Sequence, residues 1–165
     1  MNMSNEIEEK LRNGILAWQE GKEEEALALL LAAQDGGSMK AGRYLGIIYL
    51  QQAARRGDIT SEVILGMLSE YGCGLEENSE KAEEYYLSAL RDNHPDREGV
   101  MLAAGADLGM GRILALGAGI TPETSSGSSL NQLWKDACCH LKAAAEGGDE
   151  RIRREAEFWM NSGIC

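Results

Sequence analysis

The sequence LGMLSEYGCGLEENSEKAEEYYLSAL, residues 65–90, predicts two helices joined by a tight glycine loop. Apolar residues recur at helical spacing on both sides of the loop: Leu65, Leu68, Tyr71, Ala82, Tyr85, Tyr86 and Ala89. The GCG sequence at 72–74 interrupts this pattern. Gly66 and Ala82 stand where larger side chains are expected, and a helical glycine costs about 1 kcal/mol relative to alanine. We therefore expect these small residues to let two antiparallel helices approach closely.

These residues resemble the Sel-one-like repeat, a relative of the tetratricopeptide helix pair. The family consensus runs LGxxYxxGxGVxxDxxKAxxWYxKAAxxGxxxAxxxLG. Residues that match it in unbroken register are Leu65, Gly66, Gly72, Gly74, Lys81, Ala82, Tyr86 and Ala89. Residues that depart from it are Ser69, Ser88, Leu90 and Asn93. The resemblance implies an all-α fold, a right-handed α-α superhelix of the tetratricopeptide or Sel-one-like solenoid type.

Weaker matches extend the resemblance over residues 22–148, so a single helical-repeat domain of about eight helices is predicted over 1–165. The expected helices span 5–19, 22–35, 38–56, 59–71, 79–93, 96–117, 129–147 and 149–161. Stacked repeats bury their faces only against neighbours, so the segments 1–21 and 149–165 are expected to cap the stack. The polar sequence ITPETSSGSS at 120–129 predicts a loop, followed by a capping box of Ser129 and Gln132.

The helix expected at 38–56 is irregular. Repeat positions that lie 24 residues apart in the intact unit (89 − 65) are only 8 apart at Leu45 and Ala53 (53 − 45). Sixteen residues (24 − 8), which would hold the glycine loop and the front of the second helix, are therefore missing. We expect one continuous, fused helix that ends at Gly57 as its C-cap and interrupts the superhelix. A break near Gln51 would contradict this hypothesis.

The chain carries 16 basic and 27 acidic residues, for a net charge of −11. Nucleic acids and anionic membranes require cationic contacts, so neither is an expected partner. The acidity favours a basic protein partner, or simply solubility. The start MNMSNEIEEK shows no secretory signal, and apolar runs such as 26–33 are shorter than the roughly 20 residues that span a bilayer. We expect a soluble, cytoplasmic monomer or weak dimer.

Three patterns that could carry chemistry have simpler explanations. The glycine-rich segment 105–119 has no preceding strand and no GxGxxG or GK[ST] motif, so close helix packing explains it better than phosphate binding. Cys138, Cys139 and His140 are consecutive on a helix, where neighbours point about 100° apart and do not converge on a metal ion. The carboxylates at 76–84 are explained by a solvated face. We therefore expect no catalytic residue, no cofactor and no metal, and hence no enzyme.

The cysteines Cys73, Cys138, Cys139 and Cys165 show no regular spacing. Secreted members of the family that the chain resembles carry a cysteine pair in each repeat, and this chain does not. We therefore expect reduced thiols, with Cys139 facing a neighbouring helix.

In tetratricopeptide-like stacks the first helix of each pair lines a concave groove, so the resemblance implies partner-binding positions on two helices. These positions are Lys40, Arg43, Ile47, Leu50, Val63, Met67, Glu70 and Tyr71. Tyr49, Tyr85 and Tyr86 are expected in the core. The resemblance implies a non-catalytic protein–protein interaction module that acts as an adaptor or scaffold. The alternative is an acidic immunity or inhibitor protein that neutralises a basic toxin or enzyme.

Overall fold

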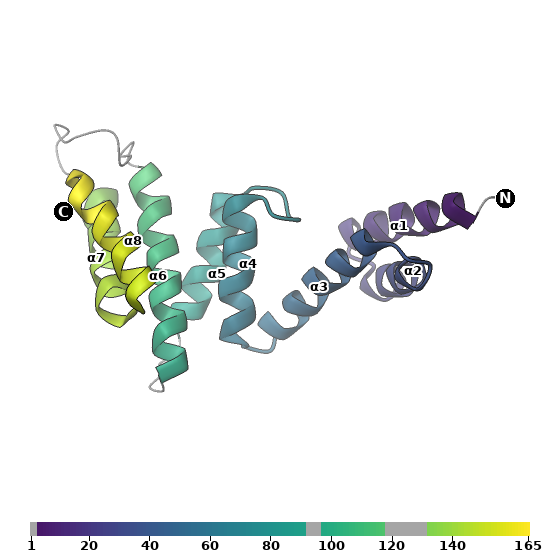
Figure 1. Ribbon diagram of the computed structural model, residues 1–165, viewed down its shortest axis with the longest axis horizontal. Coiled ribbons are helices and arrows are strands. Elements are labelled where there is room, and N and C mark those ends of the chain that lie inside the picture. The colour runs from purple at the N-terminus through teal and green to yellow at the C-terminus, as the bar shows by residue number, and fades with distance from the viewer. Residues whose placement is uncertain (1–2, 92–96, 118–131) are drawn as a thin grey trace. The chain divides into compact units, whose positions relative to one another are not determined.

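The computed structural model describes residues 3–91, 97–117 and 132–165, and within these ranges it is helical with no strand (Figure 1). The helices are α1 (Met3–Gln19), α2 (Glu23–Asp35), α3 (Met39–Ala54), α4 (Ile59–Tyr71), α5 (Ser79–Arg91), α6 (Arg97–Gly117), α7 (Gln132–Gly147) and α8 (Glu150–Trp159), followed by the π-helical turn η1 (Met160–Ile164). The all-α prediction of about eight helices is thus confirmed. The loop at 120–129 and the capping box that begins at Ser129 lie outside the described residues.

The chain forms two compact units, unit 1 at 1–56 and unit 2 at 57–165. A single helical-repeat domain over 1–165 stays a prediction. The division falls directly after α3, which runs unbroken through Gln51 to Ala54 and so confirms the expected continuous helix. Its C-cap is Arg55 rather than Gly57, and Gly57 follows two residues later with φ +83°. No residue in α3 breaks the helix, so the chain does not double back to complete a second pair here.

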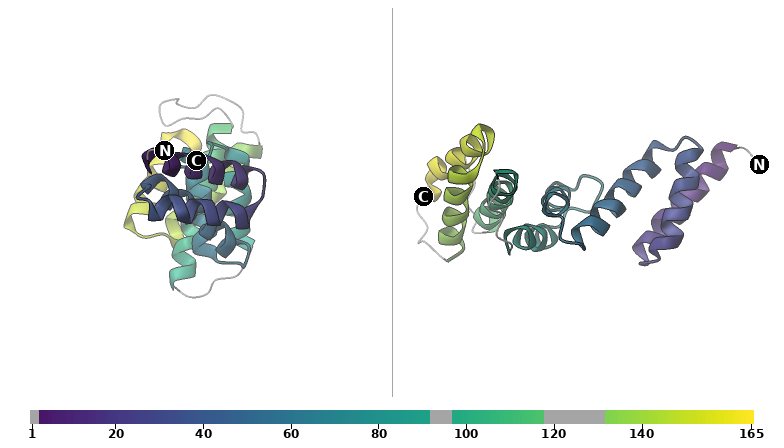
Figure 2. Two further views of the ribbon diagram at one scale, coloured as in Figure 1. Left: turned by 90° about the vertical axis from the view of Figure 1, so that its right-hand side faces the viewer. Right: turned by 90° about the horizontal axis from the view of Figure 1, so that it is seen from below.

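Unit 1 consists of α1, α2 and α3 around a small apolar core. The buried core residues are Ala17, Ala26, Leu30, Ala33, Ala41, Leu45 and Ile48. Figure 2 shows α1 and α2 side by side, and Gly14 of α1 permits this contact because a Cβ there would lie 2.8 Å from Leu30. The indole of Trp18 meets the ring of Tyr44 edge-on at 5.7 Å and donates a hydrogen bond to Gln51 at 3.1 Å. Small residues and two aromatic rings thus join the three helices.

The turn between α2 and α3 positions the start of α3 against α1. Gly37 has φ +100°, a conformation that glycine adopts without steric cost. The Ser38 side chain then caps α3 by accepting a hydrogen bond from the Ala41 N–H at 3.3 Å. Gly36 lies so close to Ile7 of α1 that a Cβ would stand 2.6 Å from it. The beginnings of α1 and α3 therefore lie near each other around this turn.

Unit 2 begins with the helix pair that the sequence predicts. Asp58 caps α4 by accepting hydrogen bonds from the hydroxyl and the backbone N–H of Ser61, and these bonds lower the pKa of Asp58. Gly72 ends α4 in the left-handed conformation, with φ +66°. The loop is closed where the Asn78 N–H donates to the Ser69 carbonyl at 2.8 Å. The pair is held by tertiary contacts as well, since Ser88 of α5 donates to the buried Glu62 of α4 at 2.7 Å.

Tyr86 is the centre of this pair, and it is completely buried. A Cβ added to Gly66 of α4 would lie 2.5 Å from its ring, and one added to Gly109 of α6 would lie 2.3 Å from it. Two glycines on different helices therefore make room for one aromatic ring. Ala82 is also fully buried, as expected for a small residue in a helix pair. The side chain that needs the space at Gly66 is the Tyr86 ring, which the sequence pattern does not reveal.

A second core lies between α6, α7 and α8. Its buried residues are Leu108, Ala115, Ala137, Leu141, Ala144 and Ala156, with Ile152 and Trp159 packed against them. Ile152, Ala156 and Trp159 of α8 therefore face inward. Gly111 of α6 touches Leu141 of α7, since a Cβ at Gly111 would lie 2.6 Å from Leu141.

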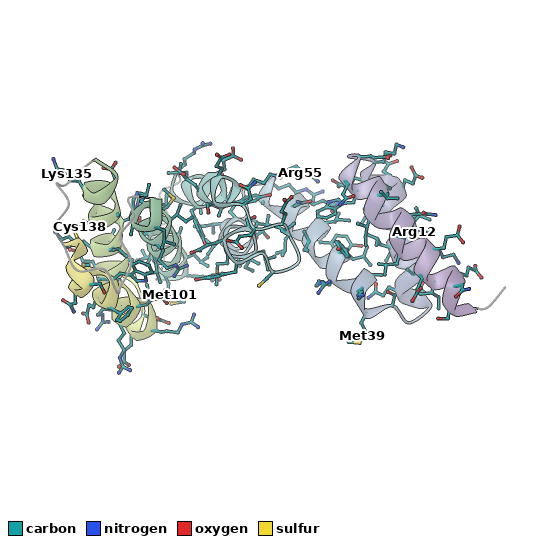
Figure 3. All side chains as sticks on the ribbon, turned by 90° about the horizontal axis from the view of Figure 1, so that it is seen from above. Arg12, Met39, Arg55, Met101, Lys135 and Cys138 are labelled. Atoms are coloured by element: carbon teal, nitrogen blue, oxygen red, sulfur yellow. A yellow bond between two sulfur atoms is a disulfide. The ribbon has the colours of Figure 1, made fainter. Side chains whose placement is uncertain are left out.

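A disulfide joins Cys138 of α7 to Cys165, with Cα atoms 5.6 Å apart; Cys138 is labelled in Figure 3. The expectation of reduced thiols is therefore wrong for these two residues. The pairing depends on α8 and η1 returning along α7, which brings together residues 27 apart in sequence. Cys73 and Cys139 are free and exposed, so the expectation that Cys139 faces a neighbouring helix is also wrong.

Helix α6 contains a segment, Glu98–Gly117, that is long and apolar enough to cross a membrane by length and composition alone. This segment is not an uninterrupted apolar run, because charged residues lie within it. Half of its apolar window is buried inside the protein. Within it, Asp107 Oδ1 lies 2.7 Å from His140 Nδ1 of α7, and Arg112 forms an ion pair with Glu70 of α4. Packing as a core helix therefore accounts for its apolar composition.

Candidate functional site

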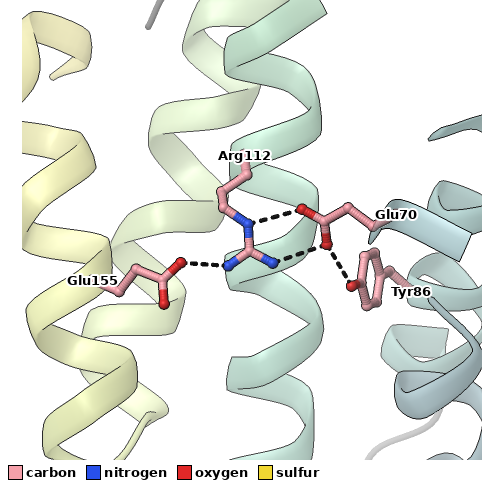
Figure 4. A network of polar contacts seen from close by, with 4 residues as sticks. All are labelled: Glu70, Tyr86, Arg112 and Glu155. Atoms are coloured by element: carbon pink, nitrogen blue, oxygen red, sulfur yellow. Dashed lines mark hydrogen bonds and ion pairs between the residues drawn. The ribbon is translucent and has the colours of Figure 1, made fainter. Parts of the chain in front are cut away.

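Arg112 of α6 is the centre of a polar network in unit 2 (Figure 4). Its Nε donates to Glu70 Oε1 at 2.9 Å and its Nη2 to Glu70 Oε2 at 2.8 Å, which makes a bidentate pair. Its Nη1 donates to Glu155 Oε1 at 2.6 Å. The hydroxyl of Tyr86 donates to Glu70 Oε2 at 2.7 Å, and the guanidinium also lies 5.5 Å from the ring centroid of Tyr71. The network joins α4, α5, α6 and α8.

The Arg112 and Glu70 side chains are each only 10% exposed, so both charges are largely removed from water. Burial alone would lower the pKa of Arg112, but the hydrogen bonds and charge of Glu70 outweigh it and raise that pKa. Burial, followed by the Glu70 carboxylate, raises the pKa of Tyr86. Within the described residues, no buried side-chain nitrogen or oxygen lacks a hydrogen-bond partner. The network is therefore satisfied internally, and its effect is to hold four helices together.

The eight predicted binding positions divide between the two units. In unit 1, Lys40 and Arg43 are exposed, Leu50 is half-buried and Ile47 is buried. In unit 2, Met67 and Tyr71 are exposed, Val63 belongs to the core and Glu70 is occupied by Arg112. Ile47, Val63 and Glu70 thus point into their own unit. Successive positions on a helix face different directions, so some of the predicted positions face the core instead of the surface. The exposed positions are Lys40, Arg43, Met67 and Tyr71.

The sequence also places three tyrosines in the core, and only Tyr86 is fully buried. Tyr85 is half-buried, and Tyr49 is 49% exposed, so the prediction for Tyr49 is wrong. Helix α3 continues past Tyr49 without a turn, and about half of the Tyr49 side chain is left in contact with solvent.

A groove lies in unit 1 between α1 and the start of α3, with a volume of about 1280 Å³. Four aliphatic residues of α1 line it, and three of them, Ile7, Leu11 and Ile15, recur every four residues and so share one helix face. The turn between α2 and α3 closes one side through Gly36 and Gly37. The rest of the lining is polar or charged, apart from Leu16 and Tyr44: Ser4, Asn5, Glu8, Glu9, Arg12, Leu16, Gln19, Ser38, Lys40, Arg43 and Tyr44.

Lys40 and Arg43 are the two predicted positions that the structure brings together in this groove. Arg12, on the facing helix α1, is a lining residue that the sequence reasoning missed (labelled in Figure 3). Leu11 belongs to the apolar face that the helical pattern predicts for α1, and Arg12 directly follows it, so the sequence predicts that Arg12 lies beside that face. The sequence does not predict that α1 lies close to α3. The Arg43 guanidinium also lies 5.8 Å from the ring centroid of Tyr44, which is a cation–π contact.

The side chains of Cys138, Cys139 and His140 do not converge. Cys138 is bonded to Cys165, Cys139 is exposed, and His140 Nδ1 lies 2.7 Å from Asp107 Oδ1. In the part of the chain that the structure describes, no group of three or more His, Cys, Asp or Glu residues could hold a metal ion. The groove of unit 1 is therefore the candidate functional site.

Comparisons with family models, with curated proteins and with solved structures found no match to this chain.

Proposed function

We propose that this chain is a non-catalytic helical-repeat module that binds another protein as an adaptor or scaffold, and that the groove of unit 1 receives the partner. The observation that carries the proposal is the groove itself. It combines the aliphatic face of Ile7, Leu11 and Ile15 with the exposed cations Lys40 and Arg43. A mixed apolar and charged concavity on a rigid helical frame is suited to gripping a peptide segment.

The repeat pattern of unit 2 supports the same class. The α4–α5 pair has the small residues, the left-handed Gly72 and the buried Tyr86 at the positions where the Sel-one-like pattern has them. We propose on this basis that the helix pairs stack in the right-handed α-α sense. A cytoplasmic location and a monomeric or weakly dimeric state belong to the same proposal.

The exposed carboxylates at 76–84 favour a second candidate, an acidic inhibitor or immunity protein that neutralises a basic toxin or enzyme. Glu76, Glu77, Glu80 and Glu84 are all exposed around the start of α5, in a chain with a net charge of −11. Such a cluster would steer a cationic partner toward unit 2. The two candidates therefore use different surfaces, which makes them separable.

Site-specific photo-crosslinking tests both candidates. A benzoylphenylalanine residue replaces Arg43 in the groove, Glu80 in the acidic segment, or Arg153 as a control that is exposed on α8. The full chain is irradiated in the organism that encodes it, and crosslinked proteins are identified by mass spectrometry. We expect Arg43 to capture a protein that Arg153 does not. Capture of a basic protein through Glu80 alone would favour the inhibitor, and no position-dependent crosslink would contradict both candidates.

A further inference from the structure

We infer that the groove of unit 1 binds a short acidic segment of another protein, with aliphatic side chains between its carboxylates. This inference rests on the proposed function and adds the chemistry of the partner. It differs from what the net charge alone suggests, because the whole chain is acidic and would favour a basic partner.

The pairing of cations in unit 1 carries the inference. Seven basic residues lie in 1–56: Lys10, Arg12, Lys22, Lys40, Arg43, Arg55 and Arg56. Three of them form ion pairs, Lys10 with Glu6, Lys22 with Glu20, and Arg55 with Glu23. The other four are exposed and have no ion pair among the described residues, and three of these four line the groove: Arg12, Lys40 and Arg43.

The charge of the groove is opposite in sign to the charge of the chain. Its lining holds three cations and only two carboxylates, Glu8 and Glu9, whereas the whole chain has a net charge of −11. Interactions between exposed charges fade beyond roughly 8 Å at physiological salt, so a short segment in the groove meets mainly the local cations. A long polyanion such as RNA extends beyond that distance and meets the acidic remainder. The groove therefore favours a short acidic peptide over nucleic acid.

The aliphatic residues determine the rest of the ligand. Ile7, Leu11 and Ile15 are half-buried and form one stripe along α1, beside Arg12. Lys40 and Arg43 lie on α3, on the other side of the groove. A peptide could place aliphatic side chains against the stripe and carboxylates toward the cations of α1 and α3, and it would then contact both the apolar and the charged lining of the groove. Apolar contact supplies most of the affinity, and the charges supply selectivity and a faster association rate.

The test is a selection from a phage-displayed library of random peptides on the full chain, followed by fluorescence titration of the enriched peptides. The double charge reversal Lys40→Glu with Arg43→Glu removes the groove cations. The double reversal Arg56→Glu with Arg153→Glu changes the net charge equally at exposed positions outside the groove, and serves as the matched control. Neither pair includes a residue with an ion pair among the described residues, so both variants should fold.

We expect enriched peptides to combine Asp or Glu with aliphatic residues. The groove variant should weaken their binding about tenfold or more, and the control by less than about threefold. Affinity should also fall as NaCl rises from about 0.05 to about 0.5 M. Peptides that depend on the groove but are basic or neutral would overturn the acidic chemistry and leave the proposed function standing. Failure to enrich any peptide, or binding that ignores the groove variant, would count against the proposed function itself. Tighter binding of a single-stranded RNA probe would overturn the choice of protein over nucleic acid.

Discussion

Unit 1 and unit 2 are built from similar helices but place their charges differently. In unit 1 the buried core consists of alanine, leucine and isoleucine, and the ion pairs of Lys10 and Lys22 lie on the surface. In unit 2 the Arg112 side chain is only 10% exposed and lies between Glu70 and Glu155. Exposed pairs contribute little to stability, whereas breaking a buried pair costs several kcal/mol.

This difference separates two uses of a basic side chain. Arg112 has all of its interactions inside unit 2, so it holds helices and is not available to a partner. Arg12, Lys40 and Arg43 have no ion pair among the described residues of unit 1, so they remain available. Loss of the first kind of cation should change folding, and loss of the second kind should change binding. The predictions below test this separation.

The largest effect is expected for Arg112→Ala. This change leaves the largely buried Glu70 without its bidentate partner, and we expect a loss of about 3–5 kcal/mol in the unfolding free energy of unit 2. Urea denaturation followed by circular dichroism measures it. The control Arg153→Ala removes an exposed arginine of α8 and should change stability by less than about 0.5 kcal/mol. A similar small change for both variants would show that the buried network does not stabilise unit 2.

The second largest effect is expected from loss of the Cys138–Cys165 disulfide, which among the described residues occurs in unit 2 alone. Cys165→Ser, or reduction with dithiothreitol, removes a link between residues 27 apart, and the chain-entropy model gives a loss of about 3.5 kcal/mol. Thermal unfolding with and without the reductant measures it. Cys139→Ser serves as the control because Cys139 is free and exposed. Equal melting temperatures for the oxidised and reduced protein would contradict a stabilising role.

Two glycine-to-alanine changes should have opposite signs. Gly66→Ala puts a methyl group 2.5 Å from the Tyr86 ring, which Gly109 confines on its other side, and we expect a loss of about 1–3 kcal/mol. Gly46→Ala in α3 meets nothing within 4 Å, so its higher helix propensity should stabilise unit 1 by up to about 1 kcal/mol. Chemical denaturation of both variants measures the difference. Stabilisation by Gly66→Ala would disprove the tight packing around Tyr86.

The smallest effect is expected for Tyr86→Phe, and it should depend on pH. The change removes the hydrogen bond to Glu70 and should cost about 1 kcal/mol at neutral pH. The folded state raises the pKa of Tyr86 above its ordinary value of 10.0, so above that pH the unfolded state releases a proton that the folded state retains. This contribution to stability is therefore complete below pH 10 and is lost as pH rises above it.

The phenylalanine variant has no such proton, so the stability difference between wild type and variant should shrink between about pH 9 and about pH 11. Denaturation at several pH values gives this difference. Lysine titration affects both proteins alike and cancels in the comparison. A difference that stays constant across the range would mean that the Tyr86 hydroxyl does not titrate differently in the two states.

Much of the fold is predictable because helix signals are local. The periodic apolar residues and the GCG break at 72–74 predict α4 at 59–71, and the short spacing from Leu45 to Ala53 predicts the continuous α3. The groove is predictable only in part. The family resemblance implies Lys40 and Arg43, but the contribution of Arg12 depends on α1 lying against the start of α3.

The sequence-based predictions fail where the surroundings of a residue are set by segments that are distant in the sequence. The resemblance implies Glu70 as a partner-binding position, but the Glu70 carboxylate is bound by Arg112, which is 42 residues away in the sequence. The family resemblance places Tyr49 in the core, but α3 continues past it without a turn and the side chain is 49% exposed. Cys138 and Cys165 have no motif spacing, and they meet because two helices and a turn bring them together.

Helix content, the positions of the glycine breaks and the fused helix all follow from interactions between residues within a few positions of each other, so the order of amino acids suffices for them. The order of amino acids does not by itself determine which cations are buried and which remain exposed to a partner. This depends on side chains that are distant in the sequence and meet only after the helices pack, because burial of a charge is stable only beside an opposite charge. Arg112 is paired with Glu70 inside unit 2, whereas Arg12, Lys40 and Arg43 of the groove form no ion pair among the described residues of unit 1.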